Sequence, residues 1–337
     1  MNYTAAFYEV FEEEEAELRK FLPPEKKYFF TSKTIQAEHR DDEPPSKIIS
    51  IRTQSRIPDN WAVILEAIIT RSTGYDHITD YLQRNSAGEK IAAAYLPDYA
   101  ARAVAEHAMM LWTALLRKSQ EMKTAFENFY RDSLTGREIQ GRKIAVIGVG
   151  RIGSQIIDIA SGLKMDYVGV DIVEREELKE KYNLKYLPLL EAISRSEIIV
   201  SALPLTEQTK GLLRKDIFLR APSRAIFVNV GRGEVVSNSD LLELLERGIL
   251  SGIGLDVFNY EKELAELLRD KKPINNFPVE VRMELNAILK MKEYPNCIFT
   301  PHNAFNTEES VLRKSQKTAE NLISYLKSGK FISSIEI

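Results

Sequence analysis

The sequence has little of several features that would place it in a special class of protein. Its 337 residues include one cysteine, Cys297, which excludes an intramolecular disulfide and favours a reducing compartment. No apolar run approaches the roughly 18 residues that span a bilayer, so we expect no membrane as partner. The N-terminal stretch MNYTAAFYEVFEEEEAEL has no basic region followed by an apolar run. We therefore expect no signal peptide and a cytoplasmic location.

The sequence also lacks a strong excess of charge of one sign. Its net charge of −3 gives no reason to expect nucleic acid or an anionic membrane as a partner. A hydrophobic content of 44% and a charged content of 28% are typical of a globular protein. Because single cores stop growing beyond about 250–300 residues, the length predicts two domains.

Short apolar runs alternate with helical patterns along the chain. The pattern predicts N-terminal strands within 26–30, 47–51, 66–71 and 90–95, and later strands within 143–148, 166–171, 197–203, 225–230 and 251–258. It predicts one long helix from about Tyr99 to Tyr130 and a C-terminal helix capped near Asn306 or Thr307. We interpret the EEEE run at 12–15 as a solvated first helical turn. The alternation predicts right-handed βαβ crossovers and parallel sheets, hence an α/β fold.

A glycine-rich turn follows the strand KIAVI and opens a helix. Gly148, Gly150 and Gly153 form the pattern GxGxxG in this context. The first glycine permits a tight turn, the second lets the backbone approach a pyrophosphate, and the third allows close packing of helix on strand. The helix N-terminus supplies N–H groups to the phosphates. The alternative is a tight turn that binds no ligand.

An acidic residue ends the next strand. Asp171 lies 18 residues after Gly153, where a carboxylate accepts hydrogen bonds from the ribose of a dinucleotide and repels a 2′-phosphate. The sequence therefore favours NAD over NADP as cofactor. Arg175 lies close by and would weaken that preference, although it is equally well interpreted as a surface arginine.

A histidine near the C-terminus stands in a loop. His302 is one of four histidines, and it follows a Thr-Pro step that favours extended backbone and the end of a strand. This places an imidazole at the rim of a sheet. We interpret His107 as a packed or capping residue and His39 as part of a loop. We also exclude His77 from the site, though less firmly, because it lies near the stretch TRSTGYDHI.

Several ordered motifs together carry a resemblance. The segments LTGREIQGRKIAVIGVGRIG (134–153), NVGRGEVV (229–236), GLDVFNYE (254–261) and TPHNAF (300–305) resemble the D-isomer-specific 2-hydroxyacid dehydrogenases, closest to their D-lactate dehydrogenase branch. The likeness covers most of the chain. It implies two Rossmann-like doubly wound parallel-sheet domains with an active-site cleft between them. It also implies a discontinuous substrate domain at 1–100 plus 303–337, an NAD-binding domain at 101–302, and a homodimer.

The resemblance assigns the catalytic roles to Arg232, Glu261 and His302. A protonated histidine can deliver a proton to the oxygen of a 2-keto acid, and a glutamate on its ring favours the charged form. The planar fork of an arginine can hold the substrate carboxylate. The alternative is an Arg–Glu pair that only joins two loops. Asn259 replaces a glutamate that is frequent in the family, and the segment 262–294 is longer than in many relatives. Its helical part is expected to close over the site, to contact a partner, or to pack on the surface.

The resemblance also implies NAD-binding and substrate-binding residues, and no metal site. The NAD-binding residues are Gly148, Gly150, Arg151, Ile152, Gly153, Asp171, Leu203, Pro204, Thr209, Val230, Gly231, Arg232 and Asp256. The substrate-binding residues are Thr73 and Gly74 for the carboxylate, and Tyr99 and Phe305 for a small apolar side chain.

The favoured function is NAD-dependent reduction of a small 2-keto acid, with pyruvate and D-lactate first. Phosphoglycerate, glyoxylate or hydroxypyruvate are alternatives. Arg52 bears on them, since relatives that act on phosphorylated acids often bind phosphate with an arginine there; a solvated Arg52 is the simpler interpretation. A remote alternative is an NAD-sensing corepressor-like protein that binds peptides.

Overall fold

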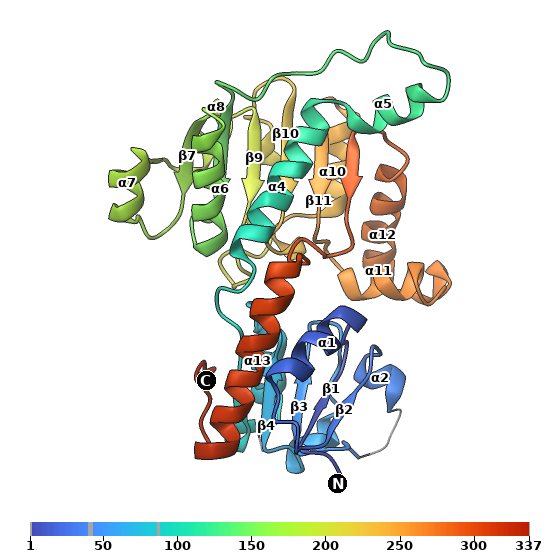
Figure 1. Ribbon diagram of the computed structural model, residues 1–337. Coiled ribbons are helices and arrows are strands. Elements are labelled where there is room, and N and C mark those ends of the chain that lie inside the picture. The colour runs from blue at the N-terminus through green and yellow to red at the C-terminus, as the bar shows by residue number, and fades with distance from the viewer. Residues whose placement is uncertain (1, 40–42, 86–87, 337) are drawn as a thin grey trace. The chain divides into compact units, whose positions relative to one another are not determined.

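The computed structural model describes residues 2–39, 43–85 and 88–336. The chain divides into two compact units, the first formed by Met1–Ala100 with Asn306–Ile337 and the second by Ala101–Phe305. Each unit contains a parallel sheet with helices packed on it (Figure 1). The predicted class, two doubly wound α/β domains, is confirmed. In the described parts of the chain no helix has the length and apolarity needed to cross a membrane.

The first unit is built on a five-stranded sheet with the order β2-β1-β3-β4-β5. Its strands are β1 (Ala5–Phe7), β2 (Tyr28–Phe30), β3 (Ile48–Ile51), β4 (Ala67–Thr70) and β5 (Ala92–Ala94). The central strands are buried along their whole length, which explains why runs such as IISI show no alternation of apolar and exposed polar residues. The sequence analysis missed the short strand β1.

In the described residues of the first unit, four α-helices and two short 3₁₀ helices accompany the sheet. They are α1 (Glu12–Phe21), α2 (Ile35–Glu38), α3 (Asp76–Arg84), α13 (Glu308–Ser328), η1 (Asp59–Val63) and η2 (Gly88–Lys90). The side chain of Thr307 accepts a hydrogen bond from the backbone N–H of Ser310, so the predicted cap of the last helix is confirmed. Helices α13 and α1 pack together, and Leu322 and Leu18 lie in one apolar cluster beside the sheet.

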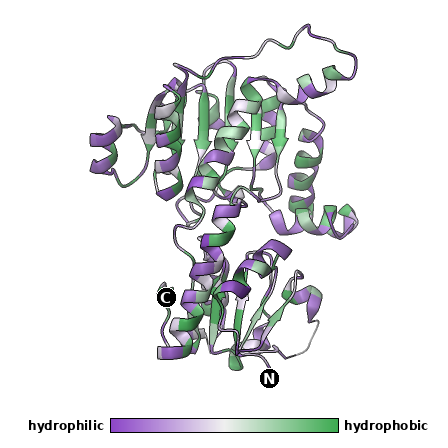
Figure 2. Cartoon of the chain, viewed as in Figure 1, coloured by the Kyte–Doolittle hydropathy of each residue, from purple (hydrophilic) through white to green (hydrophobic). Residues whose placement is uncertain are grey.

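The second unit is built on a seven-stranded parallel sheet with the order β12-β11-β10-β9-β6-β7-β8. Its strands are β6 (Lys143–Ile147), β7 (Asp166–Val170), β8 (Lys185–Tyr186), β9 (Ile198–Ser201), β10 (Ala225–Asn229), β11 (Leu250–Leu255) and β12 (Cys297–Phe299). The strand order reverses between β6 and β9, the position at which open α/β sheets bind their ligands. Figure 2 shows these strands as mostly hydrophobic and the surrounding helices as mixed, as expected for a sheet covered on both faces.

The helices of the second unit connect these strands. They are α4 (Ala101–Leu116), α5 (Ser119–Phe126), α6 (Arg151–Gly162), α7 (Glu176–Tyr182), α8 (Leu189–Arg195), α9 (Lys215–Phe218), η3 (Gly233–Val235), α10 (Asn238–Glu246), α11 (Glu261–Leu268), η4 (Ile274–Asn276) and α12 (Val279–Met291). Helices α4 and α6 pack side by side (Figure 1). A Cβ added to Gly254 of β11 would lie 3.1 Å from Cβ of Leu111, which shows how closely α4 approaches the sheet.

The predicted single helix from Tyr99 to Tyr130 was wrong. Two helices, α4 and α5, occupy this range, and Lys118 between them has a left-handed backbone with φ of 53°. A left-handed residue cannot continue a right-handed helix, so the chain turns there. The periodicity of the apolar residues continues across the break, and the sequence therefore did not reveal it.

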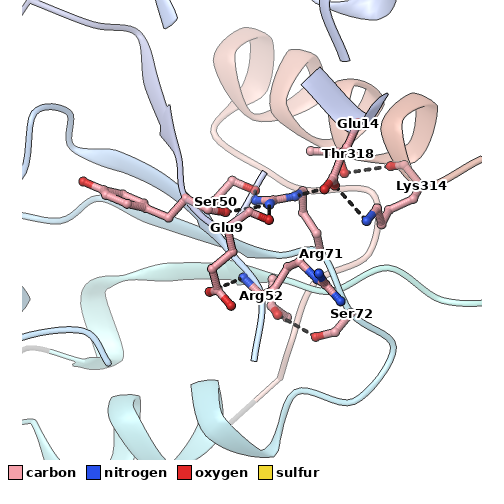
Figure 3. A network of polar contacts seen from close by, with 10 residues as sticks. Glu9, Glu14, Ser50, Arg52, Arg71, Ser72, Lys314 and Thr318 are labelled. Carbon is pink, nitrogen blue, oxygen red and sulfur yellow. Dashed lines mark hydrogen bonds and ion pairs between the residues drawn. The ribbon is translucent and has the colours of Figure 1, made fainter. Parts of the chain in front are cut away.

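The first acidic turn of α1 also differs from the prediction. Glu12 and Glu13 are exposed, but Glu14 is completely buried and pairs with two buried cations (Figure 3). Its Oε1 accepts a hydrogen bond from Nε of Arg71 at 2.8 Å and lies 2.9 Å from Nζ of Lys314. Arg71 also donates to the hydroxyl of Ser50. One carboxylate thus ties α1 and α13 to the residue that follows β4.

Two opposing effects determine the pKa of Glu14. Burial raises it, but the positive charges of Arg71, Lys314 and Arg52 together outweigh burial and lower the pKa to about 2. The unfolded chain therefore takes up a proton at this carboxylate before the folded chain does. As the pH falls from the ordinary glutamate range toward 2, the stability that Glu14 contributes is lost.

We expect Glu14→Gln to lower the free energy of unfolding by about 3–5 kcal/mol, because it leaves the buried guanidinium of Arg71 without its counter-charge. Burial already lowers the pKa of Lys314 to about 7, so without Glu14 this amine loses its proton more readily. Urea unfolding at neutral pH measures the change, with the exposed Glu13→Gln on the same helix as the matched control. The difference between the two variants should shrink as the pH approaches 3. Equal stability of the two variants at neutral pH would contradict this account.

Candidate functional site

The glycine-rich turn joins β6 to α6 in the second unit. Gly148 has φ of +89°, a conformation that favours glycine, and a Cβ on Gly153 would lie 2.1 Å from the carbonyl oxygen of Gly148. Gly150 precedes α6, and among the described residues no heavy atom other than those of its chain neighbours lies within 4 Å of the position its Cβ would take. The first turn of α6, with Arg151 and Ile152, presents backbone N–H groups at this open position. This geometry fits a pyrophosphate.

Asp171 follows β7 and is hydrogen-bonded to this turn. Its Oδ2 accepts a hydrogen bond from the backbone N–H of Val149 at 2.7 Å, and its Oδ1 accepts one from Val173 at 3.0 Å. The carboxylate therefore lies beside the glycine-rich turn, where the ribose of a dinucleotide is expected. Carboxylate oxygens can accept further hydrogen bonds from ribose hydroxyls without releasing the amides.

The other predicted NAD-binding residues follow neighbouring strands of the same sheet. Leu203 and Pro204 come after β9, and the hydroxyl of Thr209 donates to the carbonyl oxygen of Pro204 at 2.6 Å. Val230 and Gly231 follow β10. A Cβ on Gly231 would lie 2.5 Å from the carbonyl oxygen of Leu203, so the loops after β9 and β10 are in backbone contact.

The three predicted catalytic residues follow three adjacent strands. Arg232 comes after β10, Glu261 after β11 and His302 after β12, and these strands are neighbours in the sheet. Parallel strands have their carboxyl ends at one edge, so all three residues belong to the same edge of the second unit. Phe305 ends this unit and is buried.

Glu261 and His302 form a direct pair. Nδ1 of His302 lies 2.6 Å from Oε1 of Glu261, and both side chains are about one-quarter exposed, at 27% and 25%. Tyr260, just before Glu261, and His302 itself both have left-handed backbone, with φ of 57° and 52°. Such strained backbone is maintained only where surrounding contacts hold it, and it is common at functional sites.

The carboxylate of Asp256 holds the loop that carries His302. It is almost fully buried and accepts hydrogen bonds from the hydroxyl of Thr300 and from the backbone N–H groups of Asn303 and Ala304, at 2.6, 2.9 and 3.0 Å. Its predicted contact with the cofactor remains a prediction. The sequence analysis missed this bracing role, although the position of Asp256 directly after a strand was a usable signal.

His107 of α4 contributes to the same arrangement. Its Nε2 lies 2.9 Å from the hydroxyl oxygen of Thr300, whose own hydrogen is donated to Asp256, so Nε2 is the donor. Burial lowers the pKa of His107, against the opposing effect of Asp256. This contact fits the interpretation of His107 as a packed or capping residue. No signal in the sequence indicated Thr300 as its partner.

Asn229, which ends β10, fixes the loop of Arg232. Its side-chain Oδ1 accepts from the N–H of Gly231 at 3.1 Å, and its Nδ2 donates to the carbonyl oxygen of Arg232 at 2.9 Å. Asn229 is completely buried. Sequence analysis overlooked it, although a polar residue that ends the apolar run AIFV is a recognisable signal.

The predicted carboxylate-binding loop lies in the first unit, together with Tyr99. The hydroxyl of Thr73 donates to the carbonyl oxygen of Leu96 at 3.1 Å, and the carbonyl oxygen of Gly74 accepts a hydrogen bond from the hydroxyl of Ser72. Tyr99 is buried, and its carbonyl oxygen accepts a hydrogen bond from Arg313 of α13 at 2.8 Å. These contacts join the loops after β4 and β5 to each other and to the last helix.

Arg52 follows β3 in the first unit. Its backbone N–H donates to Oε2 of Glu9 at 3.0 Å (Figure 3). Its guanidinium carbon lies 4.7 Å from the ring centroid of Phe11. The other two histidines belong to this unit as well. His77 bonds with the hydroxyl of Thr70, and His39 packs against Tyr8.

Comparison with known proteins shows one family. Residues 108–304 match the model of the D-isomer specific 2-hydroxyacid dehydrogenase, NAD binding domain. The chain is 27% identical over 298 residues to the D-specific alpha-keto acid dehydrogenase of Enterococcus faecium, covering 86% of this chain and 87% of that protein. It is 30% identical over 261 residues to the aromatic 2-oxoacid reductase of Clostridium sporogenes, covering 77% of this chain and 75% of that protein.

A solved structure is similar over the whole chain. It is the D-lactate dehydrogenase from Aquifex aeolicus complexed with NAD and lactic acid, with a TM-score of 0.84 and 26% identity over 98% of this chain and 100% of that one. The cofactor of the present chain is NAD, and the open position at Gly150 beside Asp171 fits it.

We expect Asp171→Ser to weaken NADH binding by about tenfold to a hundredfold, since it removes hydrogen bonds to a charged acceptor. Preference for NADH over NADPH should fall in parallel, because the repulsion of the 2′-phosphate is lost. Titration of NADH and NADPH fluorescence measures both quantities. The matched control is Asp166→Ser at the exposed start of the same strand. Unchanged NADH affinity would argue against the assigned role.

Proposed function

Because the chain belongs to the D-isomer-specific 2-hydroxyacid dehydrogenases, we propose that it reduces pyruvate to D-lactate with NADH. The family consists of NAD-dependent oxidoreductases that act on the CH–OH group of 2-hydroxy acids. Its members differ in the acid they use: the relatives described above are named for alpha-keto acids, for aromatic 2-oxoacids and for D-lactate. The choice of pyruvate is therefore the part that requires an experiment.

One observation carries the proposal: the 2.6 Å contact between Nδ1 of His302 and Glu261, in the unit that binds NAD. With Nδ1 occupied by the carboxylate, Nε2 is the ring nitrogen available to a substrate oxygen. The contact with the carboxylate also fixes the orientation of the ring, so that Nε2 keeps a single direction. A histidine held in this way is suited to act as general acid in reduction and general base in oxidation.

The remaining residues bind and orient the substrate. Arg232 can hold the substrate carboxylate with two parallel hydrogen bonds and polarise the adjacent carbonyl group. In the first unit, Thr73 and Gly74 stay the residues expected to bind a carboxylate. NAD, when bound, supplies or accepts the hydride. The chain's own residues therefore orient the acid and move one proton at the oxygen that becomes the hydroxyl.

Two features support a small substrate. Tyr99 and Phe305, the residues expected at the substrate side chain, are large and buried, which suits a small apolar group such as the methyl of pyruvate. The similar structure from Aquifex aeolicus contains lactic acid. Within this proposal the first unit, with the carboxylate-binding loop, is the substrate domain, and the second is the NAD-binding domain.

We also propose that the protein is a cytoplasmic homodimer that associates through its second unit. Helix α5 and the segment after it expose large apolar side chains, of which Phe126, Phe129 and Tyr130 are 76%, 73% and 59% exposed. A cluster of exposed aromatic side chains is typical of an interaction surface. Light scattering of the purified protein tests this assignment.

The substrate assignment is tested by NADH absorbance with a panel of acids: pyruvate, longer 2-keto acids, hydroxypyruvate, glyoxylate and 3-phosphohydroxypyruvate. We expect the highest kcat/KM with pyruvate and D-lactate as the product on chiral analysis. Preference for the phosphorylated acid would instead favour a role of Arg52 in phosphate binding. NADH binding without turnover of any acid would favour the sensor alternative.

We expect His302→Ala to reduce kcat by about 100- to 10,000-fold, the usual contribution of a general acid–base residue. The dissociation constant of NADH should stay within about twofold, because the predicted dinucleotide contacts lie on other strands. Stopped-flow kinetics and fluorescence titration measure the two quantities. Turnover close to that of the wild type would refute the role of His302.

A further inference from the structure

Helix α12 lies in the segment 262–294, and one of its side chains contacts two catalytic loops. The carboxylate of Glu284 accepts hydrogen bonds from the hydroxyl of Ser237 at 2.8 Å and from the backbone N–H of Asn238 at 2.7 Å. Its Oε2 also accepts one from Nδ2 of Asn259 at 3.4 Å. A single carboxylate on α12 thus joins the start of α10 to the segment after β11.

The two segments lead directly to catalytic residues. The first segment begins at Ser237, and the short helix η3 and Val236 separate it from Arg232. The second contains Asn259, which is followed by Tyr260 and then Glu261. The segments also meet at a second point, because a Cβ on Gly233 would lie 1.9 Å from the carbonyl carbon of Phe258. Together these contacts set the spacing between the loop of Arg232 and the loop of Glu261.

The charges and donors around Glu284 are complementary. The carboxylate lies at the N-terminus of α10, where the helix dipole favours a negative charge. The side-chain amide of Asn259 supplies a donor to this carboxylate. Asn238 completes the network by donating from Nδ2 to the carbonyl oxygen of Asn259 at 3.1 Å. The residue at 259 and the carboxylate at 284 therefore fit each other.

The backbone that carries Glu284 is itself held in place. Val281, Leu285 and Ile288 of α12 are buried in the apolar core of the second unit, together with Leu241 and Leu244 of α10. A side chain on a packed helix keeps its direction better than one on a loop. Glu284 can therefore hold the two loops instead of following their motion.

We propose that Glu284 is a positioning residue that aligns Arg232 and Glu261, and that bracing these loops is the role of α12. Without this carboxylate, the strained backbone at Tyr260 would relax and Glu261 would lose its 2.6 Å contact with His302. The catalytic part of this inference rests on the dehydrogenase function proposed above. The structural part, which concerns the geometry of the Glu261–His302 pair, does not depend on that function.

The experiment compares Glu284→Ala and Glu284→Gln with Glu280→Ala, an exposed carboxylate on the same helix. We expect Glu284→Ala to lower kcat/KM by about tenfold to a hundredfold, since small misplacements of catalytic groups have effects of this size. Glu284→Gln, which retains one acceptor oxygen, should fall between this variant and the wild type. NADH affinity should stay within about twofold in all three.

A spectroscopic measurement separates positioning from general destabilisation. Long-range ¹H–¹⁵N spectra of the histidine rings should show a changed Nδ1 signal of His302 in Glu284→Ala, because the contact of this nitrogen with Glu261 is loosened. The signal is assigned with His302→Ala. Asn259→Ala should reproduce the change if Glu284→Ala does not fold.

The outcomes distinguish this inference from the proposed function. Lack of wild-type turnover with every acid would refute the function, and the His302 spectrum would still test the positioning by Glu284. An active wild type with Glu284→Ala and Glu280→Ala alike in kcat/KM and in the His302 spectrum would overturn the inference. A loss of activity that merely follows the unfolded fraction, with an unchanged Nδ1 signal in the folded protein, would also overturn it.

Discussion

The parallel direction of the strands is the constraint on which this structure depends. A right-handed crossover returns the chain to the start of the next strand, so every strand of a sheet ends at the same edge. In the second unit this edge collects the glycine-rich turn after β6, Asp171 after β7, and the three catalytic residues after β10, β11 and β12. Residues that lie far apart along the chain therefore come to one edge because the strands run in the same direction.

The parallel direction of the strands brings loops to one edge but does not give each loop a single conformation. Polar side chains that are buried or half-buried do this, because their hydrogen-bonding groups must find partners once they leave water. Asp256 holds the His302 loop, Asn229 holds the Arg232 loop, and Glu284 joins that loop to the segment before Glu261. Each of these side chains bonds to backbone groups, so it constrains the path of the chain itself.

The first unit uses a buried charge for a similar purpose. Glu14 joins α1, α13 and the residue after β4, and it does so with ion pairs that are completely removed from solvent. Such pairs contribute little net stability compared with apolar residues of the same volume, but removal of one partner is strongly unfavourable. The network therefore makes the unit sensitive to changes at this point. Arg71 immediately precedes the loop of Thr73 and Gly74, so the network also fixes the start of the expected carboxylate-binding loop.

The sequence by itself determined the features that local patterns encode. Apolar runs of strand length indicated most strands, the spacing of Gly148, Gly150 and Gly153 indicated the dinucleotide turn, and Thr307 indicated the start of the last helix. The ordered motifs indicated the family and the catalytic residues. These signals are local because backbone conformation and helix capping depend on residues a few positions apart.

Only the tertiary structure decided which distant groups become partners. His107 and Thr300 are 193 residues apart in the sequence, and no periodicity relates them. Glu284 and Asn238 lie on different helices, and Glu14 had the same local pattern as its exposed neighbours. The partner of a buried polar side chain depends on strand order and helix packing, which bring together residues whose local sequences are unrelated. For this reason the catalytic residues were predictable from motifs, whereas the side chains that hold them in place were not.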